Sequence, residues 1–111
     1  MSNLMIDRAA VRRHTSSRNS MGATVKTLAA AHLTDEPCRL DFLRRAREIG
    51  PNAMAEVGDP LIFMNAVDVK QGDMIELTAE GGETMTVQAL SVAIVRGFTP
   101  NHIEIIGKLV Q

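Results

Sequence analysis

The residues of this chain that could do covalent or acid–base chemistry are few and lie far apart. His14, His32 and His102 occur in separate segments without a local motif, and Cys38 is the single cysteine. A nucleophile needs a base within hydrogen-bond reach, and a lone cysteine is more often a small core residue. One cysteine also excludes an internal disulfide and a multi-cysteine zinc site. We therefore expect a protein that is not an enzyme.

Spacings typical of metal or phosphate sites are absent from the sequence. It contains no HExxH, calcium-loop, GxxxxGK or GxGxxG pattern. We expect neither a metal ion nor a cofactor. A small enzyme with a dispersed site is kept as an alternative, whose sign would be a deep pocket lined by histidines and carboxylates.

Three arginines at positions 44, 45 and 47 are the densest group of cations. One interpretation is a solvated helical face. The other is a loop whose cations face DNA, where each phosphate contact weakens with rising salt. Their spacing alone does not decide between the two.

Composition indicates one soluble globular domain spanning residues 1–111. The hydrophobic content is 45%, the charged content 23% and the formal net charge −1. No apolar run approaches the roughly 20 residues of a membrane-spanning helix, and no secretory signal is visible. Aromatic residues make up 3% of the chain, which argues against a base-stacking platform for single-stranded nucleic acid.

The net charge conceals an asymmetry between the two halves. Residues 1–50 carry nine Lys or Arg and five Asp or Glu, whereas residues 51–111 carry three and eight. These counts give net charges of +4 and −5. Either the charges intermix on the folded surface, or the subunit has one basic and one acidic face. Two such faces would suit like-with-like assembly or a position beside a phosphate backbone.

Alternating patterns predict strands through the first half of the chain. We predict an edge strand at residues 5–14, a loop at 15–22 and a strand at 23–33, where helix propensity is also high. "TDEP" is predicted to be a turn. Cys38, Leu40 and Phe42 then alternate as in a strand with one buried face.

The pattern changes after Phe42 and then returns to strands. Residues 43–50 have helical spacing before a Gly-Pro stop and predict a short helix or helical turn, within an exposed excursion at residues 44–59. Pro60 opens a short apolar strand, "KQGD" at 70–73 is a turn, and alternation from Ile103 to about Val110 predicts a closing strand.

A hairpin at residues 74–94 is the most regular feature. Ile75 and Leu77 alternate with polar residues, and Gly81-Gly82 predicts a tight primed turn, which needs positive φ. In its second strand the inward set changes phase, and a β-bulge near Ala89 would explain this. Altogether the pattern predicts a mainly β fold, a small antiparallel barrel or sandwich with one short helical or irregular excursion between the third and fourth strands.

The order of these elements resembles the head–tail adaptor and head-closure (stopper) proteins of tailed bacteriophages, over nearly the whole chain. The resemblance is carried by Arg12 and Thr15 after the first strand, Gly22 in the first turn, Cys38-Arg39-Leu40, the "VKQGD" turn at 69–73, and residues 102–105 in the last strand. The second strand departs from the family because it lacks the aromatic residue often found near its end.

The resemblance implies a small β-barrel in the neck of a virion, made in the host cytoplasm. Such subunits form a ring, a dodecamer as the resemblance implies, below the portal or adaptor and above the tail terminator or tail tube. The ring closes the channel of double-stranded DNA after packaging and offers a docking surface to the tail, without a membrane. The alternatives are a tail terminator ring protein and a monomeric small-barrel module that binds nucleic acid or protein.

Two groups of candidate site residues follow. Those assigned to a DNA-channel or stopper loop are Arg44, Arg45, Arg47, Asn52 and Met54. Those assigned to contacts within the ring or with partners are Arg12, Arg13, Met64, Asp68 and Lys70.

Overall fold

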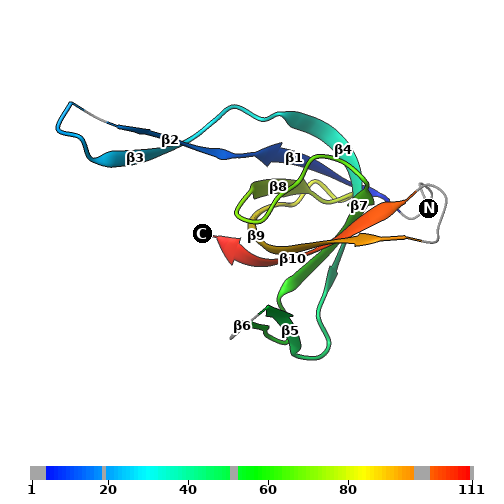
Figure 1. Cartoon of the computed structure of the whole chain (residues 1–111). Coiled ribbons are helices and arrows are strands. Elements are labelled where there is room, and N and C mark those ends of the chain that lie inside the picture. Colours follow the sequence, from blue (N-terminus) through cyan, green and yellow to red (C-terminus); the bar gives the residue numbers. More distant parts are fainter. Residues whose placement is uncertain (1–4, 19, 51–52, 97–100, 111) are drawn as a thin grey trace.

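A closed antiparallel barrel of six strands forms the body of the molecule, in the order β1-β4-β7-β10-β9-β8 (Figure 1). The computed structural model describes residues 5–18, 20–50, 53–96 and 101–110, which form strands and no helix, so none of them forms a helix that could cross a membrane. The barrel strands are β1 (Asp7–Arg12), β4 (Leu33–Phe42), β7 (Pro60–Asn65), β8 (Met74–Thr78), β9 (Thr84–Val95) and β10 (His102–Val110). The predicted mainly β barrel is confirmed.

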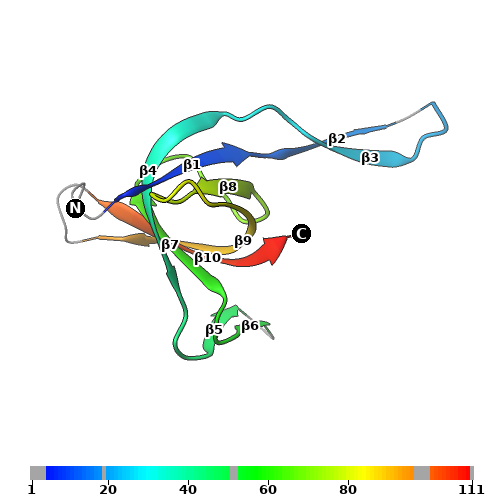
Figure 2. The ribbon, with the colours of Figure 1, turned by 180° about the vertical axis from the view of Figure 1, so that it is seen from behind.

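Two hairpins project from this barrel on different sides (Figures 1 and 2). The first, here called the arm, consists of β2 (His14–Arg18) and β3 (Thr24–Leu28) and joins β1 to β4. The loop predicted at residues 15–22 is therefore wrong over residues 15–18, which belong to β2. The second consists of β5 (Arg47–Gly50) and β6 (Ala53–Ala55) and lies in the excursion between β4 and β7. The arm makes the molecule elongated, with extents of 50 × 33 × 28 Å.

The barrel interior is filled by aliphatic side chains from alternate strand positions. Ile62, Ile75 and Ile105 are fully buried, each from a different strand, and the buried residues of β1 and β9 pack with them. Because successive side chains of a strand point to opposite faces, the alternation in the sequence determines which residues face inward. The main core therefore follows the predicted alternation in β8 and in the first part of β10. Phe42 and Ile94, which the alternation places on buried faces, are instead 42% and 58% exposed.

A β-bulge in β9 bends the barrel wall where the sequence changes phase. Ile106 of β10 pairs with Ser91 and Gly107 pairs with Ala89, so Leu90 is the extra residue. This confirms the bulge predicted near Ala89. At the bulge the two backbones approach closely: a Cβ at Gly107 would lie 2.2 Å from Val87 Cγ1 and 2.7 Å from the Gln88 carbonyl oxygen.

The β8–β9 turn has a different form from the one predicted. The Gly82 N–H donates to the Ala79 carbonyl at 2.9 Å, and only Gly82 of the two glycines has a positive φ, of 88°. A primed two-residue turn would need positive φ at its centre, whereas a longer turn followed by one left-handed glycine needs it once. The hairpin is confirmed, but its turn spans residues 79–83.

Two predictions about β1 and β4 are wrong. β1 pairs with both β4 and β8, so it is an interior strand of a closed barrel rather than an edge. The "TDEP" stretch lies inside β4, where Asp35 takes a φ of 53° at an irregularity in the β1–β4 register. Aspartate tolerates the left-handed region, so residues typical of turns here form a bulge.

The predicted helix or helical turn at residues 43–50 is also wrong. Arg47–Gly50 is strand β5, and it pairs with β6 from Arg47↔Ala55 to Gly50↔Ala53. The helical spacing arises because Leu43 and Ile49 face a small second core containing Ala55, Leu61 and Ile106. A period of three to four in so short a stretch cannot separate a helical turn from a chain that bends over a core.

Candidate functional site: the arm base and the excursion

An ion-pair network holds the base of the arm against the barrel. Arg13 donates through Nε and one terminal nitrogen to the two carboxylate oxygens of Asp73, both at 2.9 Å. It also donates to both oxygens of Asp68 at 3.2 Å. The Asp73 side chain is 2% exposed and accepts a further bond from the Lys70 N–H at 2.8 Å. Bidentate guanidinium–carboxylate pairs are among the strong hydrogen bonds of proteins and fix orientation.

Two other side chains complete this arm-base network. The Arg12 Nε donates to the Ala29 carbonyl at 2.8 Å, and its guanidinium lies 3.8 Å from the Glu76 carboxylate. His32 Nε2 lies 2.9 Å from the Asp68 carbonyl oxygen. Consecutive arginines at the end of β1 thus secure both strands of the arm to the barrel.

The network shifts the pKa values of its members. Burial alone would raise the pKa of Asp73, but hydrogen bonds from Arg13 and the Lys70 N–H outweigh it and lower that pKa. The hydrogen bonds from Arg13 likewise lower the pKa of Asp68. The same bonds raise the pKa of Arg13 further above its ordinary value. The folded state therefore favours the ionised carboxylates.

These lowered pKa values predict acid sensitivity. A carboxylate whose pKa is lower in the folded state adds stability above its unfolded pKa, about 3.9, and loses it as pH falls through the folded value. We expect the urea midpoint to be steady above about pH 5 and to fall below it. The urea midpoint of Asp73→Asn should be lower than that of the wild type above about pH 5 and should fall less steeply below it. Equal slopes for the two proteins would contradict the role of Asp73.

The excursion, residues 44–59, is anchored at its base, where Leu43 precedes it. The Leu43 N–H donates to the Asp59 carbonyl at 2.9 Å, and the Gly58 N–H donates to the Leu43 carbonyl at 2.9 Å. Leu43 and Ala55 are buried in the second core. Farther out, Met54 and Val57 are 60% and 67% exposed. The excursion is therefore a hairpin on a fixed base that presents its outer residues to solvent.

The three arginines of the excursion divide into two kinds. Arg47 forms an ion pair with Glu104 of β10 and so helps to hold the hairpin on the barrel. Arg44 and Arg45 are exposed, and neither pairs with a carboxylate among the described residues. They are the excursion cations left available to an anion.

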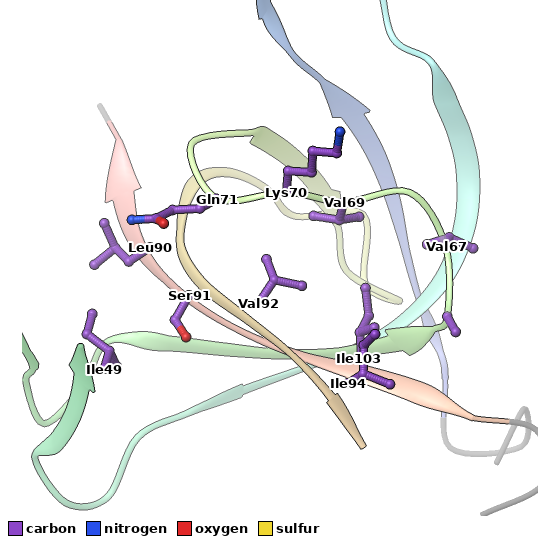
Figure 3. A pocket seen from close by; sticks show the side chains of 11 residues that line it. Ile49, Val67, Val69, Lys70, Gln71, Leu90, Ser91, Val92, Ile94 and Ile103 are labelled. Carbon is purple, nitrogen blue, oxygen red and sulfur yellow. The ribbon is translucent and has the colours of Figure 1, made fainter. Parts of the chain in front are cut away.

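An apolar groove of about 580 Å³ opens beside the β9 bulge (Figure 3). Leu90, Val92 and Ile94 of β9 line it, and Ile103 of β10 lies beside its partner Ile94. Val67 and Val69 line it from the segment after β7. Ile49 closes one end from β5. Lys70, Gln71 and Ser91 add polar groups to its lining, and no described lining residue is a histidine or a carboxylate.

The side chains that opened the sequence analysis stay apart in the structure. Cys38 is fully buried, as predicted, and burial together with the charge of Asp7 raises the pKa of its thiol to about 12. His102 is buried at the start of β10, whereas His14 lies exposed on the arm. Among the described residues, no group of three or more His, Cys, Asp or Glu is placed to hold a metal ion.

The charges of the two halves pair with one another. Arg12, Arg13 and Arg47 belong to the basic half, and their carboxylate partners all belong to the acidic half. Most of the polarity along the chain is thus cancelled across the barrel, which favours intermixed charges. The cations of the arm, Arg18 and Lys26, lie outside this pairing.

The structure brings together part of the predicted site. Arg12, Arg13 and Asp68 meet at the arm base, and Lys70 joins them through its backbone N–H. Met64, by contrast, is fully buried in the main core, so the contact with a partner assigned to it is wrong. Asn52 lies outside the described residues.

Sequence reasoning missed Asp73 and His32 as members of the network. Asp73 was visible as the last residue of the "VKQGD" turn, where its side chain accepts the Lys70 N–H three residues back. Aspartate side chains commonly form such local bonds with backbone groups three residues back. Its pairing with Arg13, 60 residues away, has no local signal.

Comparison with known proteins adds no relative to this description. The chain matches no protein-family model, and no curated protein matches it.

Proposed function

We propose that this chain is a structural subunit of the neck of a tailed bacteriophage. In this proposal it forms a homo-oligomeric ring, a dodecamer, below the portal or adaptor. The ring closes the DNA channel after packaging and presents a docking surface to the tail terminator or tail tube. The protein is made in the host cytoplasm, resides in the virion and has no catalytic step.

The observation that carries the proposal is a closed barrel with two projections, the arm between β1 and β4 and the excursion between β4 and β7. The excursion lies between β4 and β7 and presents the exposed Arg44 and Arg45. This is the place in the strand order where stopper proteins, which the sequence resembles, have their channel loop. Two cations per subunit, repeated around a ring, would give a channel collar suited to a phosphate backbone.

Electron microscopy tests the ring. The protein is mixed with purified portal–adaptor complexes, beside the protein alone and the complexes alone. We expect an added ring stacked on the complex, with density from residues 44–59 lining or crossing the channel. If no ring forms and the protein binds DNA in a salt-dependent way as a monomer, the neck proposal is wrong and the small-barrel binding module is favoured.

A second test concerns the two available cations of the excursion. Arg44→Gln/Arg45→Gln should leave folding and ring formation intact but lower the fraction of filled heads that retain DNA, because phosphate contacts are lost. Arg47 is left in place since it pairs with Glu104. The measurement is the DNA content of assembled heads.

The matched control for this variant is Arg39→Gln/Arg96→Gln. Both control positions are exposed and lie outside the excursion. Unchanged DNA retention in the Arg44→Gln/Arg45→Gln variant would return these arginines to the role of a solvated surface.

A further inference from the structure

The arm is a two-stranded hairpin without a core of its own. Every residue of β2 is exposed, and β3 is exposed apart from the partly buried Leu28. An isolated hairpin of this kind is at best marginally stable in water. Its base is held by the arm-base network, but among the described residues nothing covers its faces. Such an element gains stability when a partner packs on it.

The two faces of the arm differ in charge. Residues that pair directly across the two strands point to the same face, and alternate pairs share that face. The pairs Ser16↔Lys26 and Arg18↔Thr24 therefore place Lys26 and Arg18 on one face, together with His14. The other side carries the neutral pairs Thr15↔Thr27 and Ser17↔Val25. No carboxylate occurs in residues 8–34. The two like charges on one face repel each other in the monomer.

The charged face opens onto a hollow of about 570 Å³. Its arm side is lined by His14, Ser16 and Lys26, and its barrel side by Lys70 and Gln71 of the turn after β7. Asp73 also lines it, but its charge is matched by Arg13. Lys26 and Lys70 form no ion pair with any described residue. We call this the cationic hollow.

The acidic turn, residues 79–83, lies at the opposite end of β1. Glu80 and Glu83 are exposed there, and no Lys or Arg occurs in residues 71–95. The buried carboxylate of Asp7 accepts the Glu80 N–H at 3.1 Å and holds the turn on the barrel. This turn is therefore a rigid, negatively charged projection.

The hollow and the acidic turn cannot meet within one molecule. Arg8 pairs with Thr78 beside the acidic turn, while the arm begins after Arg12 and runs away from the barrel (Figure 1). The eight residue steps from Arg8 to Ser16 span roughly 26 Å at about 3.3 Å per step. This exceeds the screening length of about 8 Å at physiological salt. Only another copy can bring the two charges together.

We propose that the cationic hollow takes the acidic turn of a second copy of this chain. The contact joins two different surfaces, so it is head-to-tail and can repeat around a ring. It rests on the proposed ring function, to which it adds the surfaces that join neighbouring subunits. Lys26 and Lys70 face Glu80 and Glu83 in this contact, and Arg18 adds to the attraction from farther along the arm.

Charge reversal tests this contact in the full-length protein. Arg18→Glu/Lys26→Glu reverses the charge of the arm, and Glu80→Lys/Glu83→Lys reverses the charge of the acidic turn. Self-association is measured by sedimentation equilibrium in about 50 mM salt, where the Debye length is longer than at physiological salt. We expect each variant alone to associate at least about tenfold more weakly than the wild type, because like charges then face each other. An equimolar mixture of the two variants should recover association.

The control is Arg39→Glu/Arg96→Glu, which makes the same change of net charge at exposed positions away from the hollow. It should associate like the wild type. A wild type that stays monomeric, a control as weak as the arm variant, or a mixture without recovery would each overturn the contact. So would an arm variant that associates normally but loses affinity for duplex DNA, since the arm would then be a DNA-binding surface.

This outcome is separable from that of the ring experiment. Rings on the portal–adaptor complex formed equally by the wild type and the arm variant would leave the neck proposal standing and overturn the contact. Head-to-tail association without binding to that complex would support the contact and overturn the neck proposal.

Discussion

Replacing Asp73 with alanine is expected to lower the free energy of unfolding by about 2–4 kcal/mol. The change removes both Arg13–Asp73 hydrogen bonds and the acceptor of the Lys70 N–H. Because the Asp73 side chain is 2% exposed, water cannot freely replace those bonds. The measurement is urea unfolding at pH 7 and low salt.

The effect should also be visible locally at the arm. The Ala29 N–H donates to the Arg13 carbonyl, and the His32 N–H donates to the Val11 carbonyl, both at 3.0 Å. These bonds close the arm base that Arg13 secures. In Asp73→Ala the exchange of these two amides should accelerate more than that of core amides, because local opening then costs less than global unfolding.

The control for this prediction is Asp68→Ala. Asp68 pairs with the same Arg13, but its side chain is 59% exposed, and exposed ion pairs contribute little. We expect Asp68→Ala to lower the free energy of unfolding clearly less than Asp73→Ala does. Equal losses in the two variants would show that burial of Asp73 is not the source of its contribution.

Replacing Gly107 with alanine is expected to lower the free energy of unfolding by about 1–3 kcal/mol. Replacing it with valine is expected to lower it further. The added Cβ would meet Val87 Cγ1 at 2.2 Å and the Gln88 carbonyl oxygen at 2.7 Å. A side chain can rotate away, but the backbone carbonyl belongs to the paired wall of the barrel. The two strands must therefore separate at the bulge, which weakens the ladder on which β9 depends.

Two comparisons give this prediction its specificity. Gly81→Ala adds the same methyl group where nothing lies within 4 Å. The free energy of unfolding of this variant should therefore stay within about 0.5 kcal/mol of the wild type. Combining Gly107→Ala with Val87→Ala should cost less than the sum of the single changes, since the nearest atom is gone. Strict additivity would contradict the close approach as the cause.

Most of the strand assignments could be predicted because they depend on local periodicity. Alternation predicts β8, β9 and β10, a short apolar run predicts β7, and the change of phase in β9 locates its bulge. The wrong assignments fall at residues whose type and spacing are compatible with more than one backbone structure. Asp35 forms a bulge in place of a turn, and Leu43 and Ile49 face a small core without being helical. The residues alone do not distinguish these uses.

The candidate site was only partly predictable. Arg12, Arg13 and Asp68 were selected from the sequence, but their meeting point was not, because Arg13 is 55 and 60 residues away from its two carboxylates. Met64 is predicted to contact a partner because it lies near the excursion, and methionine serves at interfaces as well as in cores. Its burial depends on which face of β7 meets the barrel interior.

The sequence by itself determined the mainly β class and the uneven distribution of charge. It also indicated strands for the barrel, but not β2, β5 or β6 of the projecting hairpins. Period-two alternation and turn residues carry that information locally. Only the tertiary structure decided which charges cancel and which remain, because barrel closure places β1 beside β8 and so sets Arg12 and Arg13 against acids far along the chain. The arm cations and the acidic turn are left at opposite ends of β1 for the same reason: closure fixes the register of β1 with its neighbours.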